Sequence, residues 1–229
     1  MIEKKKEFYG GFGLLIGFTA ILIVTFSPVF KGQNGLEYLD DLYNSISKGS
    51  AYYIPKVKAE TEPFSGRSIS ATIEMADESQ TQQTAALFMK GGALVNISGT
   101  RLKIEGDLGK ILANCLADAD RMYMNDGQAI SSRYGYDERQ VLFNWHQGLI
   151  AMDKVLKKQK QFQEAKIVDL VVKKAVETSY NYYRVEPQKI SDRAFIVFFS
   201  LVFYVIYTLW YGFAIMFMFT GIGLHLDEH

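Results

Sequence analysis

Cysteine, histidine and proline are scarce in this sequence of 229 residues, which holds one cysteine, three histidines and four prolines. The lone Cys115 cannot form a disulfide within the chain, so a folded domain must be stable through its own core. It also excludes an iron–sulfur cluster built by this chain alone. Because free cysteine is among the most buried residue types, we interpret Cys115 as a small buried apolar residue in a helix.

Charged residues are absent from two long stretches. No Asp, Glu, Lys or Arg occurs between residues 8 and 30 or between residues 194 and 226. Between these stretches, residues 31 to 193 hold 22 Lys or Arg against 21 Asp or Glu. This near balance lacks the basic excess with which nucleic-acid-binding domains meet phosphate, so we expect no nucleic-acid partner.

The first uncharged stretch fits a membrane helix. Residues 10 to 29 supply the 20 apolar residues that are needed to cross about 30 Å of hydrocarbon. Lys4, Lys5 and Lys6 precede it, and a basic flank stays in the cytoplasm. No small-x-small cleavage site follows, so we expect an uncleaved helix over residues 10–30, with residues 1–9 in the cytoplasm.

The second uncharged stretch is longer than a membrane requires. Residues 194–224 would form a helix of about 46 Å, which must tilt or protrude. Its aromatic residues are not confined to two interfacial belts, so we expect some rings to face protein. Residues 225–229 would then form a short cytoplasmic tail.

Small residues recur in both apolar stretches. The Gly13-x-x-x-Gly17 spacing places two glycines on one helix face, where helix backbones can approach closely. Gly212 lies in the second stretch beside Trp210 and Tyr211. We take Gly13, Gly17, Gly212, Trp210 and Tyr211 as candidate helix-packing residues.

The middle of the chain, residues 31–193, reads as one mainly helical α+β domain. Apolar spacing predicts a helix over residues 35–48, and proline and glycine predict an extended connector over 51–67. We further expect a strand at 70–75, a helix at 77–90, a β-hairpin from 94–97 and 101–105, and a helix at 107–124.

A single long helix is predicted between residues 137 and 185, which contain no proline and one glycine. Its apolar residues step by three and four, the spacing of a helix-packing seam. We take this seam as a candidate partner-docking face; it comprises Leu142, Trp145, Leu149, Met152 and Leu156. The polar residues 157–161 allow a turn between two antiparallel helices instead, but they hold no Gly, Pro, Asn or Asp, which favours one helix.

Groups that could carry catalysis are few. His146 has no second metal ligand four residues later, so a structural or partly exposed histidine is expected. His225 and His229 have helical spacing, but two nitrogens do not complete a zinc site. Asp118 and Asp120 lie two residues apart, do not share a helix face and are expected to be solvated. We therefore expect no cofactor, no metal and no enzymatic activity.

Taken together, these features predict an α-rich membrane protein in which two transmembrane helices flank an extracytoplasmic domain. The expected location is a cell membrane, namely the inner membrane of a bacterium. The function that fits best is a non-catalytic accessory or structural subunit of a larger complex, which docks partners through its extracytoplasmic domain and its aromatic transmembrane helix. The expected partners are other membrane protein subunits or further copies of itself, together with the lipid bilayer. The alternative is an extracytoplasmic sensor that signals laterally to a partner membrane protein, since a five-residue tail cannot hold an output module.

Overall fold

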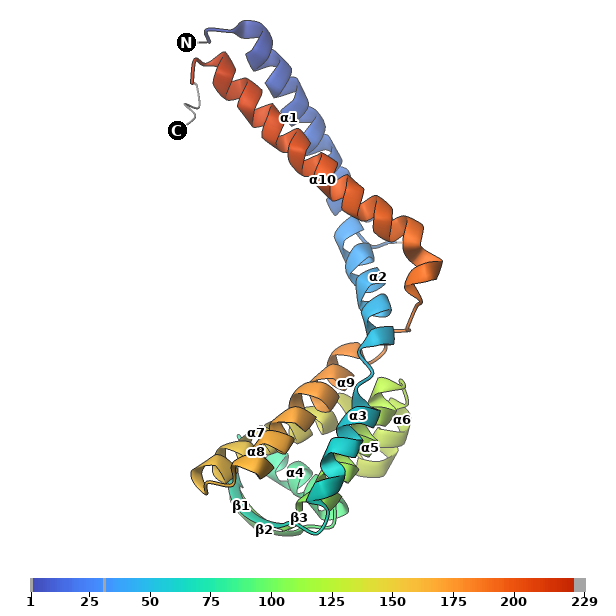
Figure 1. Ribbon diagram of the computed structural model, residues 1–229, viewed down its shortest axis with the longest axis vertical. Coiled ribbons are helices and arrows are strands. Elements are labelled where there is room, and N and C mark those ends of the chain that lie inside the picture. Colours follow the sequence, from blue (N-terminus) through green and yellow to red (C-terminus); the bar gives the residue numbers. More distant parts are fainter. Residues whose placement is uncertain (1, 31, 225–229) are drawn as a thin grey trace. The chain divides into compact units, whose positions relative to one another are not determined.

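The computed structural model describes residues 2–30 and 32–224 of the chain, and it is shown in Figure 1. The chain forms two compact units. The terminal unit comprises Met1–Gly49 and Glu186–His229, and the central unit comprises Ser50–Val185. The sequence-based domain boundary at residues 31–193 differs from this division, because the helix that begins at residue 35 belongs to the terminal unit. The predicted tail at residues 225–229 lies outside the described residues.

Three helices make up the described part of the terminal unit: α1 (Lys5–Phe26), α2 (Gly35–Ser50) and α10 (Ile190–Gly221). Figure 1 shows α1 and α10 side by side, and their contacts are antiparallel, with Phe8 at Gly221 and Phe18 at Tyr207. Helix α1 ends at Phe26 because Ser27 precedes Pro28 and takes an extended conformation. Both α1 and α10 are long and apolar enough to cross a membrane.

The small sheet of the central unit contains β1 (Ser68–Glu74), β2 (Leu94–Ser98) and β3 (Arg101–Asp107). All pairs are antiparallel and the strand order is β1-β3-β2. The predicted hairpin of β2 and β3 is confirmed, with Gly99 at a positive φ of 58° in its turn. The buried side chains of β1 alternate with exposed ones, so one sheet face is covered by the core.

Helices account for most of the central unit. They are α3 (Ile54–Thr61), α4 (Glu78–Lys90), α5 (Leu108–Tyr123), α6 (Gly127–Tyr134), α7 (Glu138–Lys158), α8 (Phe162–Val171) and α9 (Glu177–Tyr182), with a 3-10 turn at Glu62–Phe64 and a π-helical segment at Val172–Val176. Aspartates begin α4, α5 and α7: the carboxylates of Asp77, Asp107 and Asp137 each accept a hydrogen bond from a backbone N–H three residues later. These caps explain why the predicted starts of the three helices are close to the observed ones.

Two expectations about secondary structure are wrong. Residues 51–67 are not an extended connector, because they contain α3 and the 3-10 turn. Pro55 lies in the first turn of α3, where a missing N–H costs no hydrogen bond. The second error is the single helix over residues 137–185, since α7 and α8 are separate helices that pack against each other.

The turn that separates α7 from α8 depends on Lys160. Its φ of 62° lies in the left-handed region, which lysine rarely adopts. The backbone N–H of Gln161 donates to the carbonyl of Leu156 (2.9 Å), and the N–H of Lys160 donates to that of Lys157 (3.1 Å). These two bonds satisfy carbonyls at the end of α7 and form the helix-ending motif that usually has glycine at this position.

Replacement of Lys160 by glycine should therefore stabilise the central unit. Lys160→Gly removes a left-handed conformational cost of about 1 kcal/mol for a residue with a β-carbon. The measurement is the unfolding free energy from hydrogen exchange of the slowest amides of α7, with the full chain in mild detergent. Gln159→Gly is the matched control and should give no gain, since the φ of Gln159 is an ordinary −81°. Equal effects of the two substitutions would contradict this account of the turn.

Candidate functional site

The seam of α7 predicted as a docking face lies inside the core. Leu142, Trp145, Leu149, Met152 and Leu156 are each 0% exposed. Trp145 makes an edge-on contact with Phe88 of α4, with ring centroids 5.3 Å apart. The docking interpretation needs correction, because the domain itself covers these side chains and a partner cannot reach them in this fold.

The helix-packing candidates lie at different places along α1 and α10. A β-carbon on Gly17 would stand 3.0 Å from the Trp210 ring, and the Trp210 Nε1–H donates to the carbonyl of Leu14 at 3.0 Å. Tyr211 lies against Phe18, with ring centroids 5.1 Å apart. Gly13 and Gly212 face open space, with no atom of the described residues within 4 Å of an added β-carbon. The structure thus brings Gly17, Trp210 and Tyr211 into the helix contact but not Gly13 or Gly212.

Two other glycines allow the closest approach of α1 and α10. An added β-carbon on Gly11 would lie 2.7 Å from the carbonyl oxygen of Ala214, and one on Gly221 would lie 2.6 Å from the backbone nitrogen of Phe8. Real β-carbons do not approach other atoms so closely, so both positions require glycine for this contact. Gly11 lies next to other glycines in the sequence, and spacing alone gave no means of choosing among them.

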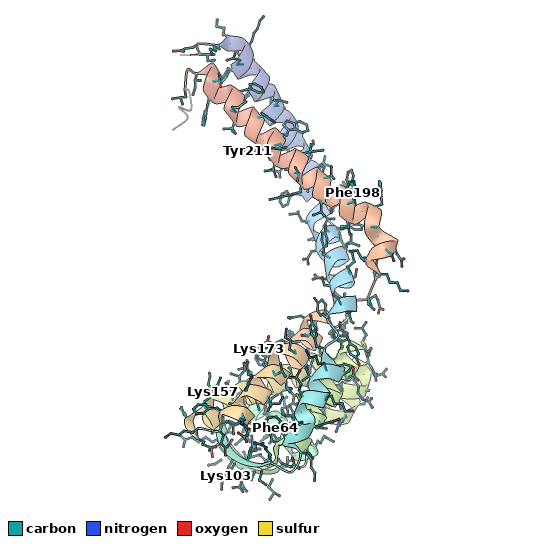
Figure 2. All side chains as sticks on the ribbon, in the orientation of Figure 1. Phe64, Lys103, Lys157, Lys173, Phe198 and Tyr211 are labelled. Atoms are coloured by element: carbon teal, nitrogen blue, oxygen red, sulfur yellow. The ribbon has the colours of Figure 1, made fainter. Side chains whose placement is uncertain are left out.

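A row of stacked aromatic rings runs along α10 at intervals of four residues. Ring centroids are 6.4 Å apart for Phe195 and Phe199, 6.1 Å for Phe199 and Phe203, and 5.5 Å for Phe203 and Tyr207. Tyr207 then stacks on Phe18 of α1 at 4.2 Å. We call these five residues the aromatic row; its first members are exposed, with Phe195 at 79%. Figure 2 shows further side chains of α10, including Phe198 and Tyr211.

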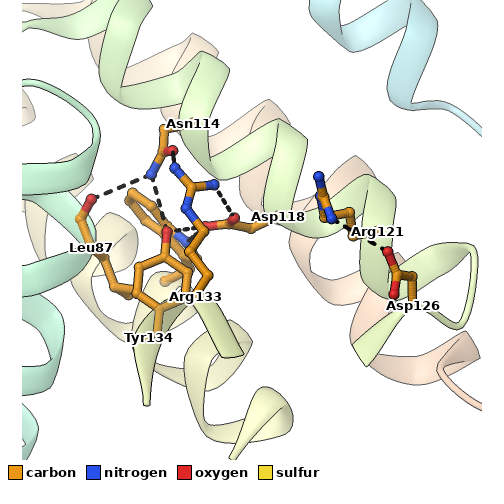
Figure 3. A network of polar contacts seen from close by, with 8 residues as sticks. Leu87, Asn114, Asp118, Arg121, Asp126, Arg133 and Tyr134 are labelled. Carbon is orange, nitrogen blue, oxygen red and sulfur yellow. Dashed lines mark hydrogen bonds and ion pairs between the residues drawn. The ribbon is translucent and has the colours of Figure 1, made fainter. Parts of the chain in front are cut away.

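A buried carboxylate joins three helices in the central unit, as Figure 3 shows. Asp118 of α5 is 0% exposed, which corrects the expectation that it is solvated. Its carboxylate accepts hydrogen bonds from the Tyr134 hydroxyl, from the Trp145 Nε1–H at 2.9 Å and from the Arg133 guanidinium at 2.8 Å. Arg133 also donates to the Asn114 side-chain oxygen at 2.6 Å. The network links α5 to α6 and α7.

Burial dominates the electrostatics of this network. It raises the pKa of Asp118, and the hydrogen bonds from Tyr134 and Trp145 and the charge of Arg133 oppose that rise. Burial and the neighbouring Asp118 raise the pKa of Tyr134 well above its ordinary value, so its hydroxyl keeps its proton and donates. Every oxygen of the Asp118 carboxylate has a donor, which is the pattern of a structural network.

His146, the histidine within the described residues, does not belong to a metal site. His146 lies 3.1 Å from a carboxylate oxygen of Glu177 on α9. Among residues 2–30 and 32–224, no group of three or more His, Cys, Asp or Glu side chains could hold a metal ion. His225 and His229 lie outside the described residues.

Grooves lie in both units. In the terminal unit, an apolar groove of about 480 Å³ is lined by α1, α2 and α10, among them Ile21, Leu39 and Phe199. In the central unit, a groove of about 530 Å³ lies between β1 and α7, and one of about 570 Å³ lies between the segment around Phe64 and α8. Figure 2 labels Phe64, which is one of the residues that line this last groove. Sequence periodicity does not identify any of these grooves, because they depend on which elements become neighbours.

Comparison with protein-family models, with curated proteins and with solved structures finds no match for this chain.

Removal of the buried carboxylate should destabilise the central unit strongly. Asp118→Ala leaves three donors without an acceptor, one of them a charged guanidinium, so we expect a loss of about 3 kcal/mol. Hydrogen exchange of the α5 and α7 amides measures the loss. Asp126→Ala is the matched control: it removes an exposed pair with Arg121, which should be worth less than about 1 kcal/mol. Similar losses in the two variants would contradict the structural role of Asp118.

Proposed function

We propose that this chain is a non-catalytic accessory subunit of a larger membrane protein assembly, and that the exposed aromatic side chains of α10 pack against transmembrane helices of partner subunits. The observation that carries the proposal is the aromatic row, which leaves the contact with α1 and continues as exposed rings toward the start of α10. Aromatic rings that serve only to hold a helix at the membrane surface gather near its two ends.

The lengths and packing of the two helices support this proposal. Helix α10 has 32 residues, about 48 Å, whereas α1 has 22 residues, about 33 Å. Only Ala214 and Gly221 of α10 are buried in the described chain. Most of its apolar surface is therefore available to lipid or to a partner helix, and stacked rings give a partner specific shapes to pack against.

The proposed orientation places the amino terminus in the cytoplasm and the central unit outside it. It is supported by Lys4, Lys5 and Lys6, which immediately precede or begin α1. The membrane proposed is that of a bacterial cell. In this arrangement the central unit meets the partner outside the cytoplasm, and α10 meets it within the bilayer.

Purification with mild detergent tests the proposal. The tagged full chain should co-purify with other membrane subunits in fixed stoichiometry, identified by mass spectrometry. Phe195→Leu with Phe199→Leu removes two exposed rings but keeps the helix apolar, and it should lower partner recovery at least about threefold, since aromatic contacts of this kind are worth about 1 kcal/mol beyond their area.

The matched control is Phe12→Leu with Phe26→Leu, which removes two exposed rings from α1 instead. This variant should retain its partners. A wild-type chain that elutes alone, and that gains thermal stability with a small molecule, would contradict the subunit proposal and favour a sensor.

A further inference from the structure

Strand β1 has an unpaired edge. It pairs with β3 on one side, and among the described residues the strand order β1-β3-β2 places no strand on its other side. Backbone groups in an antiparallel strand point alternately toward and away from a given neighbour. The groups that point away from β3 therefore need partners from outside the sheet.

The hydrogen bonds at the two ends of β1 show which groups these are. The N–H of Met75 donates to the carbonyl of Thr100 at 2.9 Å, and the N–H of Leu108 donates to the carbonyl of Arg67 at 2.8 Å. Met75 and Arg67 thus face β3, and the alternation assigns the same direction to every second residue between them. It follows that the backbone groups of Thr72 and Glu74 point to the unpaired edge.

Side chains form hydrogen bonds with the outward backbone groups near the two ends of this edge, but not at its centre. The Gln159 amide donates to the carbonyl of Ser70 at 2.9 Å, and the Gln80 side-chain oxygen accepts from the N–H of Ala76 at 3.1 Å. In the described part of the chain, the outward N–H and C=O groups of Thr72 and Glu74 have no such partner. Two adjacent rungs of donor and acceptor are left open, as an additional strand would require.

These open rungs border the groove between β1 and α7. Its volume is about 530 Å³, and its α7 wall includes the exposed Phe143 and the half-buried Ile150 and Ala151. Lys154 and Lys158 also line the groove, and neither forms an ion pair with a described carboxylate. The groove therefore combines backbone groups, apolar surface and two unpaired positive charges.

We infer that this groove binds an extended peptide segment of a partner protein, which adds to the edge of β1 as a fourth strand. Alternating backbone donors and acceptors recognise another backbone, and the adjacent pockets select every second side chain. Because α7 packs on the core face of β1, the inward side chains of the added strand contact Phe143, Ile150 and Ala151 and are apolar. A carboxylate of the segment pairs with Lys154 or Lys158. This inference rests on the proposed function, since it names how the central unit holds a partner subunit.

A synthetic peptide tests the inference without knowledge of the natural partner. The probe is an eight-residue peptide that alternates valine and glutamate, added to the full-length chain in mild detergent. It should bind, and hydrogen exchange should slow at the amides of Thr72 and Glu74 but not at those of the opposite edge strand β2. Two control peptides carry N-methyl groups at every second amide, one at the odd-numbered and one at the even-numbered positions. The peptide whose methylated amides face β1 lacks the backbone donors that pair with the strand, so it should bind at least about tenfold more weakly.

Variants of the protein test the two walls of the groove. Lys154→Glu with Lys158→Glu should weaken peptide binding about tenfold, by loss of the ion pair that the segment makes with Lys154 or Lys158 and by repulsion. Lys56→Glu with Lys58→Glu makes the same change of charge on exposed positions of α3 and should not affect binding. Ala151→Trp fills the groove and should abolish binding, with the exchange of the buried α7 amides confirming that the fold is intact.

Absence of peptide binding to the wild-type chain, or binding that protects β2 instead, would overturn the inference. Equal binding of the unmethylated peptide and both methylated peptides would do the same. Failure of the peptide-binding inference can be distinguished from failure of the proposed function. A chain that co-purifies with membrane subunits but binds no peptide contradicts only the inference. A chain that binds the peptide but always elutes alone contradicts the proposed function.

Discussion

The central unit depends on the burial of the apolar side chains of α7. A side chain that is buried in the core of the domain is not accessible to a partner protein. The five-residue seam from Leu142 to Leu156 is buried by the sheet and the neighbouring helices, so it supplies the core rather than a docking face. Burial of such side chains is worth roughly 1.5–3 kcal/mol each, which makes this seam a main source of stability. What remains for a partner is the other side of α7, where Phe143 and Ile150 border the groove beside β1.

In the terminal unit, too, the contacts within the chain determine which apolar surface remains exposed. Gly11 and Gly221 let α1 and α10 approach closely over one narrow stripe, and Trp210 closes over Gly17. A narrow stripe of small residues covers little of a helix that is 32 residues long, so most of α10 stays uncovered. That uncovered surface and the unpaired edge of β1 are two independent features that fit a chain which completes its packing in an assembly.

Local features could be predicted from the sequence, and features that depend on neighbours could not. The caps Asp77, Asp107 and Asp137 determine helix starts through contacts three residues away, and the hairpin turn at Gly99 is equally local. Lys160 gave no signal for a turn, because its left-handed conformation is imposed by the packing of α8 on α7 rather than favoured by lysine. Periodicity showed that one face of α7 is covered, but not that the chain covers it itself. The burial of Asp118 and the free edge of β1 both follow from tertiary arrangement.

The most direct test of the subunit account is photocrosslinking in intact membranes from a reactive amino acid placed at Phe198, an exposed position on α10. The account predicts crosslinks to one or a few membrane proteins of defined mass, with fewer from Ile16, which is exposed on α1. Crosslinks from Phe198 to lipid alone, at every level of expression, would contradict it.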